Sequence, residues 1–363
     1  MKNKDIFDAL GGIDDRFVSE AAPKRTAFKK QKPRSAVRWL TAAACLCIAA
    51  AVFLGYWLIS PARLQKIPPS ADGSSGLGAG AQEIIVRDMS EYITGNPWSA
   101  DMNLKRLPVY KNTQSQSYDD MLDNINKVAE KLGVEIKSVT RETMPDSDWV
   151  VSEDSLYAVR AETDISLISA FATGGVSISF SEPVAGNGTG RDAAEYFVKK
   201  YFSVIGFKNP VLCVTSDYDI NGGESAEYRV YDGLGGDLKR VKSYNFGSVY
   251  FDINENGGLE SIRISSVDGA KKLGDYPIIS YKEAEKLLLG GEYISGSADG
   301  TENGNITREK IKKVELVYSI DSMDAYFAPY YRFYVELDRS PAVGFKCYGE
   351  FDVPAVNSKY IAN

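Results

Sequence analysis

Apolar positions are densest between Trp39 and Ile59, where 21 consecutive residues include no charged side chain. At a rise of about 1.5 Å per residue, a helix of this length covers roughly 31 Å, which matches a hydrocarbon core of about 30 Å. Trp39 begins the run, and Tyr56 and Trp57 stand near its end, where aromatic rings settle at headgroup level. The pattern predicts one transmembrane helix over residues 39–59.

The charges beside this run predict its orientation. Residues 1–38 carry ten Lys/Arg, whereas the first twenty residues beyond the run carry only Arg63 and Lys66. The positive-inside rule then places the N-terminus in the cytoplasm and the rest of the chain outside the cell membrane. A cleaved signal peptide is the alternative, although both the 38-residue lead and the apolar run are long for one.

Beyond the run, residues 60–82 concentrate Pro, Gly, Ser and Ala without a periodic apolar face. This composition predicts a flexible linker, which argues against rigid coupling between the span and the outer part of the chain. From residue 83 onward, helical and alternating spacings of apolar residues succeed one another. Helices are predicted at 117–132, 191–205 and 281–289, and strands at 84–86, 134–139, 156–161, 165–172, 176–181, 211–216, 227–231, 241–246, 248–253, 259–265, 313–320, 330–337 and 345–353.

The turns between these runs favour antiparallel sheet. Residues 254–258, Asn-Glu-Asn-Gly-Gly, join two alternating runs as a hairpin. The fold class predicted is α+β, with three units in which a helix precedes antiparallel strands. The predicted organisation is a cytoplasmic tail at 1–38, the span at 39–59, the linker at 60–82, an extracytoplasmic α+β region at 83–270 and a C-terminal α+β unit at 271–363.

Two runs imitate the start of a calcium loop. They are Asp217-x-Asp219-x-Asn221-Gly222 and Asp252-x-Asn254-x-Asn256-Gly257. An EF-hand needs a bidentate Glu at its twelfth position, and the residues there are Tyr228 and Arg263. Asn, Asp and Gly at these places are typical of turns, so we predict hairpins and no metal site.

Charge and the lack of histidine exclude several classes of function. The formal charge is −7, but residues 1–59 hold ten basic and five acidic groups, which leaves the remainder at −12 and disfavours nucleic-acid binding. The chain has no histidine, which excludes Ser-His-Asp and Cys-His catalysis and the common zinc sites. We therefore predict no catalytic residue and no cofactor. Whether Cys213 and Cys347 form a disulfide stays open at this stage.

The tail carries a short helical stripe. Ile6, Leu10, Ile13 and Phe17 lie at spacings of four, three and four, and a pair of glycines interrupts them. Helices this short are marginal in water alone, so a tethered amphipathic segment of this kind favours docking into a partner's groove. A tail without a partner is the alternative.

Residues 13–21, IDDRFVSEA, are followed by a basic stretch and a single span. This arrangement resembles the cytoplasmic segment of Gram-positive, especially clostridial, membrane proteins that accompany extracytoplasmic-function sigma factors. The resemblance implies an anti-sigma-type regulator that binds a sigma factor by a helix in a groove. The zinc-type subclass is excluded because its histidine and cysteines are missing. The implied partner-binding residues are Ile13, Asp14, Asp15, Phe17, Val18 and Glu20.

The C-terminal part carries a second resemblance, which rests on YPIISYKEAEKLL at 276–288, VELVYSI at 314–320, YFAPYYRFYVEL at 326–337 and VPAV at 353–356. It resembles the outer domains of YycH/YycI-type regulators of sensor kinases and, more loosely, the PepSY fold. Tyr326, Phe327 and Tyr330 form a candidate outer ligand groove.

The sequence thus predicts a single-pass regulatory protein that binds a sigma factor inside the cell and an unidentified ligand or protein outside it. A regulator acting beside a sensor kinase, or a cell-surface binding module with an inert tail, are the alternatives.

Overall fold

The computed structural model describes residues 64–68, 83–113, 116–143, 156–265, 270–295, 306–320, 324–339 and 344–362. The chain divides into two compact units, Met1–Pro61 and Ala62–Asn363. The predicted tail and span lie outside the described residues, and among the described helices none has the length and apolar character to cross a membrane. Helices and antiparallel sheets are mixed throughout the second unit, which confirms the α+β class.

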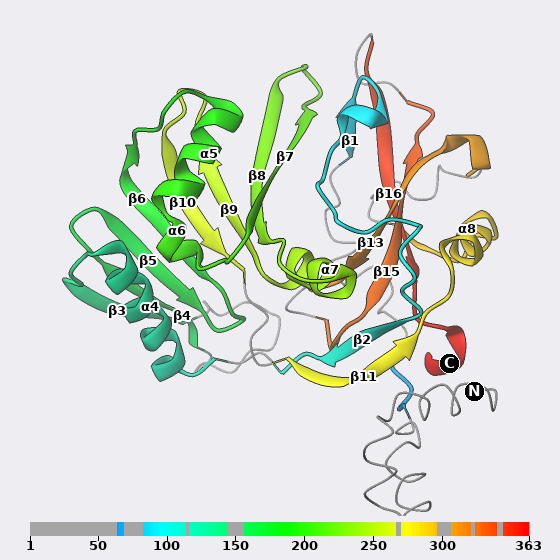
Figure 1. The fold of residues 1–363 in the computed structure, drawn as a ribbon, viewed down its shortest axis with the longest axis horizontal. Coiled ribbons are helices and arrows are strands. Elements are labelled where there is room, and N and C mark those ends of the chain that lie inside the picture. Colours follow the sequence, from blue (N-terminus) through cyan, green and yellow to red (C-terminus); the bar gives the residue numbers. More distant parts are fainter. Residues whose placement is uncertain are drawn as a thin grey trace, which may run out of the picture. The chain divides into compact units, whose positions relative to one another are not determined.

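The larger sheet has eight antiparallel strands in the order β3-β4-β5-β6-β10-β9-β8-β7 (Figure 1). Its strands are β3 (Ser138–Thr143), β4 (Leu156–Glu162), β5 (Ser166–Phe171), β6 (Val176–Val184), β7 (Pro210–Tyr218), β8 (Glu224–Asp232), β9 (Ser248–Ile253) and β10 (Leu259–Ile264). Each half is a four-stranded meander preceded by a helix, and β6 pairs with β10 to join the halves. Two of the three predicted helix-and-sheet units therefore share one sheet.

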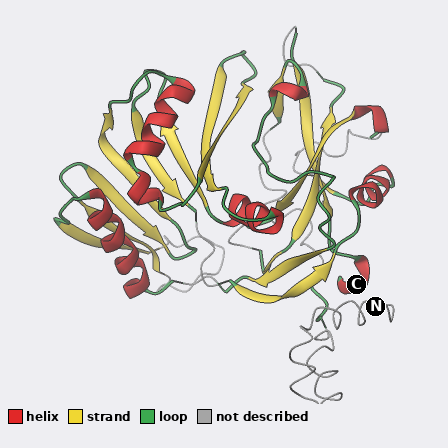
Figure 2. Ribbon diagram, viewed as in Figure 1, coloured by secondary structure: helices red, strands yellow, loops and turns green. Residues whose placement is uncertain are grey.

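The helices of this sheet cover one of its faces (Figure 2). They are α4 (Tyr118–Leu132), α5 (Gly190–Lys200) and α6 (Phe202–Ile205). Ser117 and Asp120 form a capping box at the start of α4, and Gly133 ends it in the left-handed conformation. Met121 and Ile125 of α4 are fully buried against the sheet. The predicted helix at 117–132 is confirmed, whereas that at 191–205 breaks at Tyr201 into α5 and α6.

Two further sheets form the rest of the unit. The five-stranded sheet runs β1 (Ile84–Val86), β16 (Lys346–Pro354), β15 (Pro329–Glu336), β13 (Ile311–Tyr318), with β12 (Ile294–Ser295) also on β16. The three-stranded sheet runs β11 (Lys271–Pro277), β2 (Arg106–Lys111), β14 (Tyr326–Phe327). The helix α8 (Tyr281–Leu289), predicted at these residues, packs on β16. The strands β1 and β2 precede α4 in the chain, yet they pair with strands of the C-terminal third.

One predicted strand is wrong. Residues 241–246 lie in a helix, α7 (Asp237–Phe246), which follows Gly236 as its N-cap. Val241 and Tyr244 are three residues apart and both buried, which is a helical spacing, because residues three apart in a strand would face opposite sides of the sheet. The strand predicted at 134–139 begins only at Ser138, and β2 and β11 were not predicted because Pro108 and Gly274 interrupt their apolar alternation.

Part of the predicted linker is packed against the domain. Ile67 forms a parallel bridge with Ile361 and is 4% exposed. Its N–H donates to the carbonyl of Tyr360 at 2.9 Å, and the Tyr276 hydroxyl donates to the carbonyl of Gln65 at 3.0 Å. Residues 64–68, the docked segment from here on, thus do not form a free connection.

Candidate functional site

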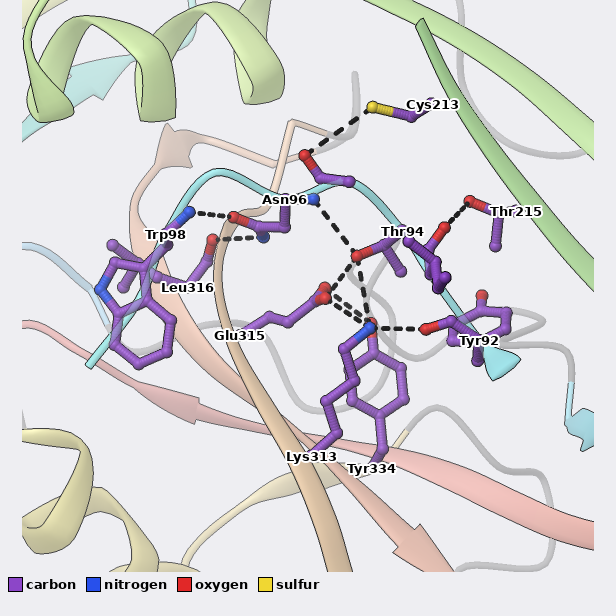
Figure 3. Close-up of polar contacts among 12 residues, drawn as sticks. Tyr92, Thr94, Asn96, Trp98, Cys213, Thr215, Lys313, Glu315, Leu316 and Tyr334 are labelled. Carbon is purple, nitrogen blue, oxygen red and sulfur yellow. Dashed lines mark hydrogen bonds and ion pairs between the residues drawn. The ribbon is translucent and has the colours of Figure 1, made fainter. Parts of the chain in front are cut away.

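A segment of extended chain crosses between the edges of the two large sheets (Figure 3). Residues 92–98, the strap, lie between β7 of the eight-stranded sheet and β13 of the five-stranded sheet. On one side, the hydroxyl of Thr215 donates to the carbonyl of Ile93 at 3.0 Å. On the other, the Asn96 amide donates to the carbonyl of Leu316 at 3.0 Å. The strap is therefore held by a side chain of the edge strand β7 and by a backbone carbonyl of the edge strand β13.

A buried carboxylate anchors the strap to β13. Glu315 is 5% exposed and accepts hydrogen bonds from the hydroxyls of Thr94 and Tyr334. The ammonium of Lys313 lies 2.8 Å from Glu315 Oε1 and also donates to the carbonyl of Tyr92 at 2.8 Å. Every charge in this cluster has a partner, as buried charges require.

Polar residues form a continuous ladder across three neighbouring strands. Glu315, Arg332 and Asp352 are aligned on β13, β15 and β16. One step further along, Lys313, Tyr334 and Glu350 are aligned in the same way. Because these positions alternate with buried Phe333 and Phe351, one face of the sheet is apolar and the other carries charge.

Arg332 stands at the centre of this ladder. Its Nε and Nη2 donate to the two carboxylate oxygens of Asp352 at 3.0 and 2.9 Å. Its Nη1 lies 3.0 Å from Glu350 Oε2. Burial raises the pKa of Glu350 to about 7; Asp352 and Glu315 act in the same direction, against the lowering effect of Arg332. This carboxyl therefore changes charge near neutral pH.

A second arginine faces the ladder from the eight-stranded sheet. The Arg229 guanidinium lies between the rings of Tyr244 and Tyr250, 4.6 and 4.9 Å from their centroids. It donates to the Tyr250 hydroxyl, and its Nε lies 3.6 Å from Glu227 Oε1, beyond hydrogen-bond distance. Within the described residues, this buried Nε has no hydrogen-bond acceptor.

These groups enclose a polar pocket of about 270 Å³, just below the usual range for ligand sites. Its lining comprises Tyr92, Thr94, Thr215, Glu227, Arg229, Tyr244, Asn245, Tyr250, Glu315, Val317, Tyr318, Ile320, Arg332, Tyr334 and Glu350. We call it the inter-sheet pocket. Guanidinium groups, carboxylates and phenol hydroxyls converge there, which suits a small polar molecule that offers both donors and acceptors. In the described part of the chain, no three His, Cys, Asp or Glu side chains are placed to hold a metal ion.

The strap's position depends on Gly95. It has φ of +69°, and a Cβ there would collide with the side chain of Cys213. We expect Gly95→Ala to lower the free energy of unfolding by about 1–2 kcal/mol more than Gly133→Ala does. Both substitutions place an alanine in the left-handed conformation, but only the first also forces a Cβ against the side chain of Cys213. Gly133 has φ of +70° and open space around its Cα, which makes it the matched control. Urea unfolding of the three proteins measures the difference, and equal losses would contradict the role of the close approach.

The residues of the predicted outer groove do not line one surface. Phe327 is fully buried in the core, and Tyr326 pairs with Lys111 at a sheet edge. Tyr330 is 6% exposed and lines a different, apolar pocket. The predicted partner-binding residues at 13–20 lie outside the described residues.

The other predicted features take definite positions. Asp219 and Asn254 each accept backbone N–H bonds within their turns, and these turns connect β7 to β8 and β9 to β10. The predicted hairpins are therefore confirmed. Cys213 on β7 and Cys347 on β16 are free thiols in separate sheets.

Sequence reasoning missed the inter-sheet pocket. A signal was present in Arg332 and Tyr334, and in Glu350 and Asp352, which are polar positions at a spacing of two inside strongly apolar strands. Their meeting with Arg229 depends on the arrangement of two sheets, which a strand pattern does not contain.

No family model and no curated protein matches the chain. Among solved structures, it is similar to the crystal structure of an uncharacterized protein from Eubacterium rectale ATCC 33656, at 12% identity over 70% of this chain and 84% of that chain. The TM-score is 0.30, so this likeness carries no argument about function.

Proposed function

We propose that the chain is a single-pass membrane regulatory protein of the anti-sigma type. Its tail at residues 1–38 binds a sigma factor in the cytoplasm, and its α+β unit binds a small polar ligand outside the cell. Ligand binding in the inter-sheet pocket is the input, and a change in the tail's hold on the sigma factor is the output.

The observation that carries this proposal is the division of the chain at Pro61. The boundary falls two residues beyond the apolar run that ends at Ile59, so the compact unit begins where the predicted span stops. This supports a division of labour between two compartments. The charge split, positive before the run and negative after it, supports the same orientation.

The polar pocket supports a sensing role for the unit. Its Arg229 Nε has no acceptor in the described chain, and its Glu350 has a pKa of about 7. A ligand that supplies an acceptor would satisfy the Arg229 Nε. Because the pocket lies between two sheets, such a ligand would contact both at once.

A pull-down tests the proposal directly. Tagged residues 1–38 are incubated with lysate of the native organism, and the retained proteins are identified by mass spectrometry. We expect a sigma factor of the extracytoplasmic-function class. A bait with the IDDRFVSEA run scrambled is the control, and failure to retain any sigma factor would count against the proposal.

Within this binding mode, Phe17→Ala and Ile13→Ala are each expected to weaken sigma-factor binding by about 1–3 kcal/mol, as apolar anchors in a groove do. Ile6 lies on the same helical stripe but outside the IDDRFVSEA run, so we expect Ile6→Ala to weaken sigma-factor binding less. Isothermal titration with the purified sigma factor measures the three changes. Parent-like affinity for both Phe17→Ala and Ile13→Ala would rule out the groove.

A second candidate function is regulation of a sensor kinase through the span and the outer unit. The docked segment favours it, because only residues 60–63 separate the apolar run from packed chain. So short a connection transmits lateral or rotational movement better than a free linker of 23 residues. Retention of a histidine kinase by the full chain, with nothing retained by residues 1–38, would favour this alternative.

A further inference from the structure

A second pocket, of about 350 Å³, lies where the docked segment packs against the C-terminal residues. Its lining is mostly aliphatic and includes Ile67, Leu287, Ile294, Val353, Val356 and Ile361. Among the described residues that line it, Glu292 is the only charged one. We call it the basal pocket. Covering such apolar walls with an apolar ligand is favourable, by about 25 cal/mol per Å² of apolar surface removed from water.

The undescribed segments of the chain that begin beside the basal pocket are poor candidates to fill it. Residues 69–82 continue directly from Pro68 at its lining, and Leu77 is their only large apolar residue. Residues 296–305 continue from β12, which also contributes to the lining, and they contain no large apolar residue. Neither segment therefore offers the apolar side chains that would fill the pocket.

The short connection between the docked segment and the proposed span indicates that the membrane is the nearest source of an apolar ligand. Five Cα–Cα steps separate residue 59 from residue 64, so these atoms are at most about 17 Å apart even in a fully extended chain. The docked segment, whose Ile67 and Pro68 line the basal pocket, is thereby held near the membrane surface. This step rests on the proposed function, since it requires residues 39–59 to span the membrane.

From the apolar lining and this short connection we infer that the basal pocket binds one acyl chain of a bilayer lipid. A free fatty acid would bring its carboxylate close to Glu292, where like charges repel. An ester-linked chain carries no charge at that point and leaves its head group at the mouth. The acyl chain fixes the α+β unit against the membrane by a second contact besides the span.

The test uses the full chain reconstituted in nanodiscs that contain a phospholipid with a photoactivatable diazirine on one acyl chain. After irradiation and digestion, labelled peptides are mapped by mass spectrometry. We expect label on residues 39–59 and also on peptides that contain 287–294 and 353–361. Leu287→Glu is expected to reduce label on 353–361 at least fivefold and to leave label on 39–59 unchanged.

Leu289→Glu is the matched control, because Leu289 lies on the same helix, is exposed and does not line the pocket. We expect it to keep the parental labelling. If Leu287→Glu lowers the melting temperature enough to unfold the unit, Ser358→Trp replaces it. Ser358 is an exposed lining residue, and Lys359→Trp, at the neighbouring exposed position outside the lining, is its control.

The outcomes separate the inference from the proposed function. Label on 39–59 without label at the pocket would overturn the acyl-chain site and leave the membrane span intact. No label on 39–59 would overturn both. In a parallel arm, a diazirine fatty acid is added to unlabelled nanodiscs; pocket label from the fatty acid alone would overturn the bilayer lipid as the source.

Discussion

Arg332→Met is expected to lower the free energy of unfolding of residues 62–363 by about 3–5 kcal/mol. Arg332 holds both oxygens of Asp352, whose side chain is 3% exposed, and also pairs with Glu350. Methionine fills a similar volume but leaves these carboxylates buried without their cation. The loss arises from that orphaned charge, because replacing a whole buried ion pair by apolar groups is often nearly neutral.

Urea unfolding followed by tryptophan fluorescence and circular dichroism measures this loss. Arg308→Met is the control: Arg308 is 71% exposed and forms an exposed ion pair with Glu285, so we expect a loss below about 1 kcal/mol. Adding Asp352→Asn to Arg332→Met is expected to recover part of the stability, because it removes one orphaned charge. If Arg332→Met were as mild as Arg308→Met, the ladder would not be a stabilising centre of the five-stranded sheet.

Local sequence signals predict the helices better than they predict the sheet arrangement. Ser117 and Gly133 bracket α4, and Ser280 caps α8, so both helices carry their own start or stop. The strand β2, by contrast, contains Pro108 and pairs with β11 and β14, which lie more than 150 residues further along the chain. Nothing in its local pattern specifies partners so distant, because strand pairing is decided by the packing of the whole unit.

The candidate site was hidden for a similar reason. Arg229 and Arg332 come from two sheets, and each has a charged neighbour in its own strand or the next one. In a strand pattern such residues look like ordinary surface charge. Their burial becomes visible only when the strap at residues 92–98 brings β7 and β13 to the same pocket.

Under the proposed function, the docked segment changes how a signal would pass between the tail and the α+β unit. A flexible linker of 23 residues would disconnect the proposed span from this unit, whereas a connection of four residues would not. Ile67 pairs with Ile361, and the strand β16 that carries Glu350 and Asp352 ends at Pro354. Glu350 at the inter-sheet pocket is therefore eleven residues of chain from Ile361, which pairs with the segment that leads to the proposed span.

Glu350→Gln is expected to change how stability depends on pH. The carboxyl has a pKa of about 7 in the folded state against an ordinary value of 4.5, so the folded state binds its proton more tightly. Its contribution to stability is then fully present below pH 4.5 and is lost as the pH rises to about 7. Each unit of pKa difference corresponds to about 1.4 kcal/mol, so the parent loses about 3 kcal/mol over this window and Glu350→Gln does not.

Urea midpoints of both proteins between pH 4 and pH 8 test this expectation, with the stability of Glu350→Gln relative to the parent rising through the window. Glu283→Gln provides a control of opposite sign. The backbone N–H and hydroxyl of Ser280 donate to Glu283 and lower its pKa, so its contribution is present above pH 4.5 and is lost on further acidification. Parallel curves for the parent and Glu350→Gln would mean that the pKa of Glu350 in the folded state lies near its ordinary value of 4.5. The inter-sheet pocket would then hold a carboxylate at neutral pH, and a ligand would have to supply its donor to that charge.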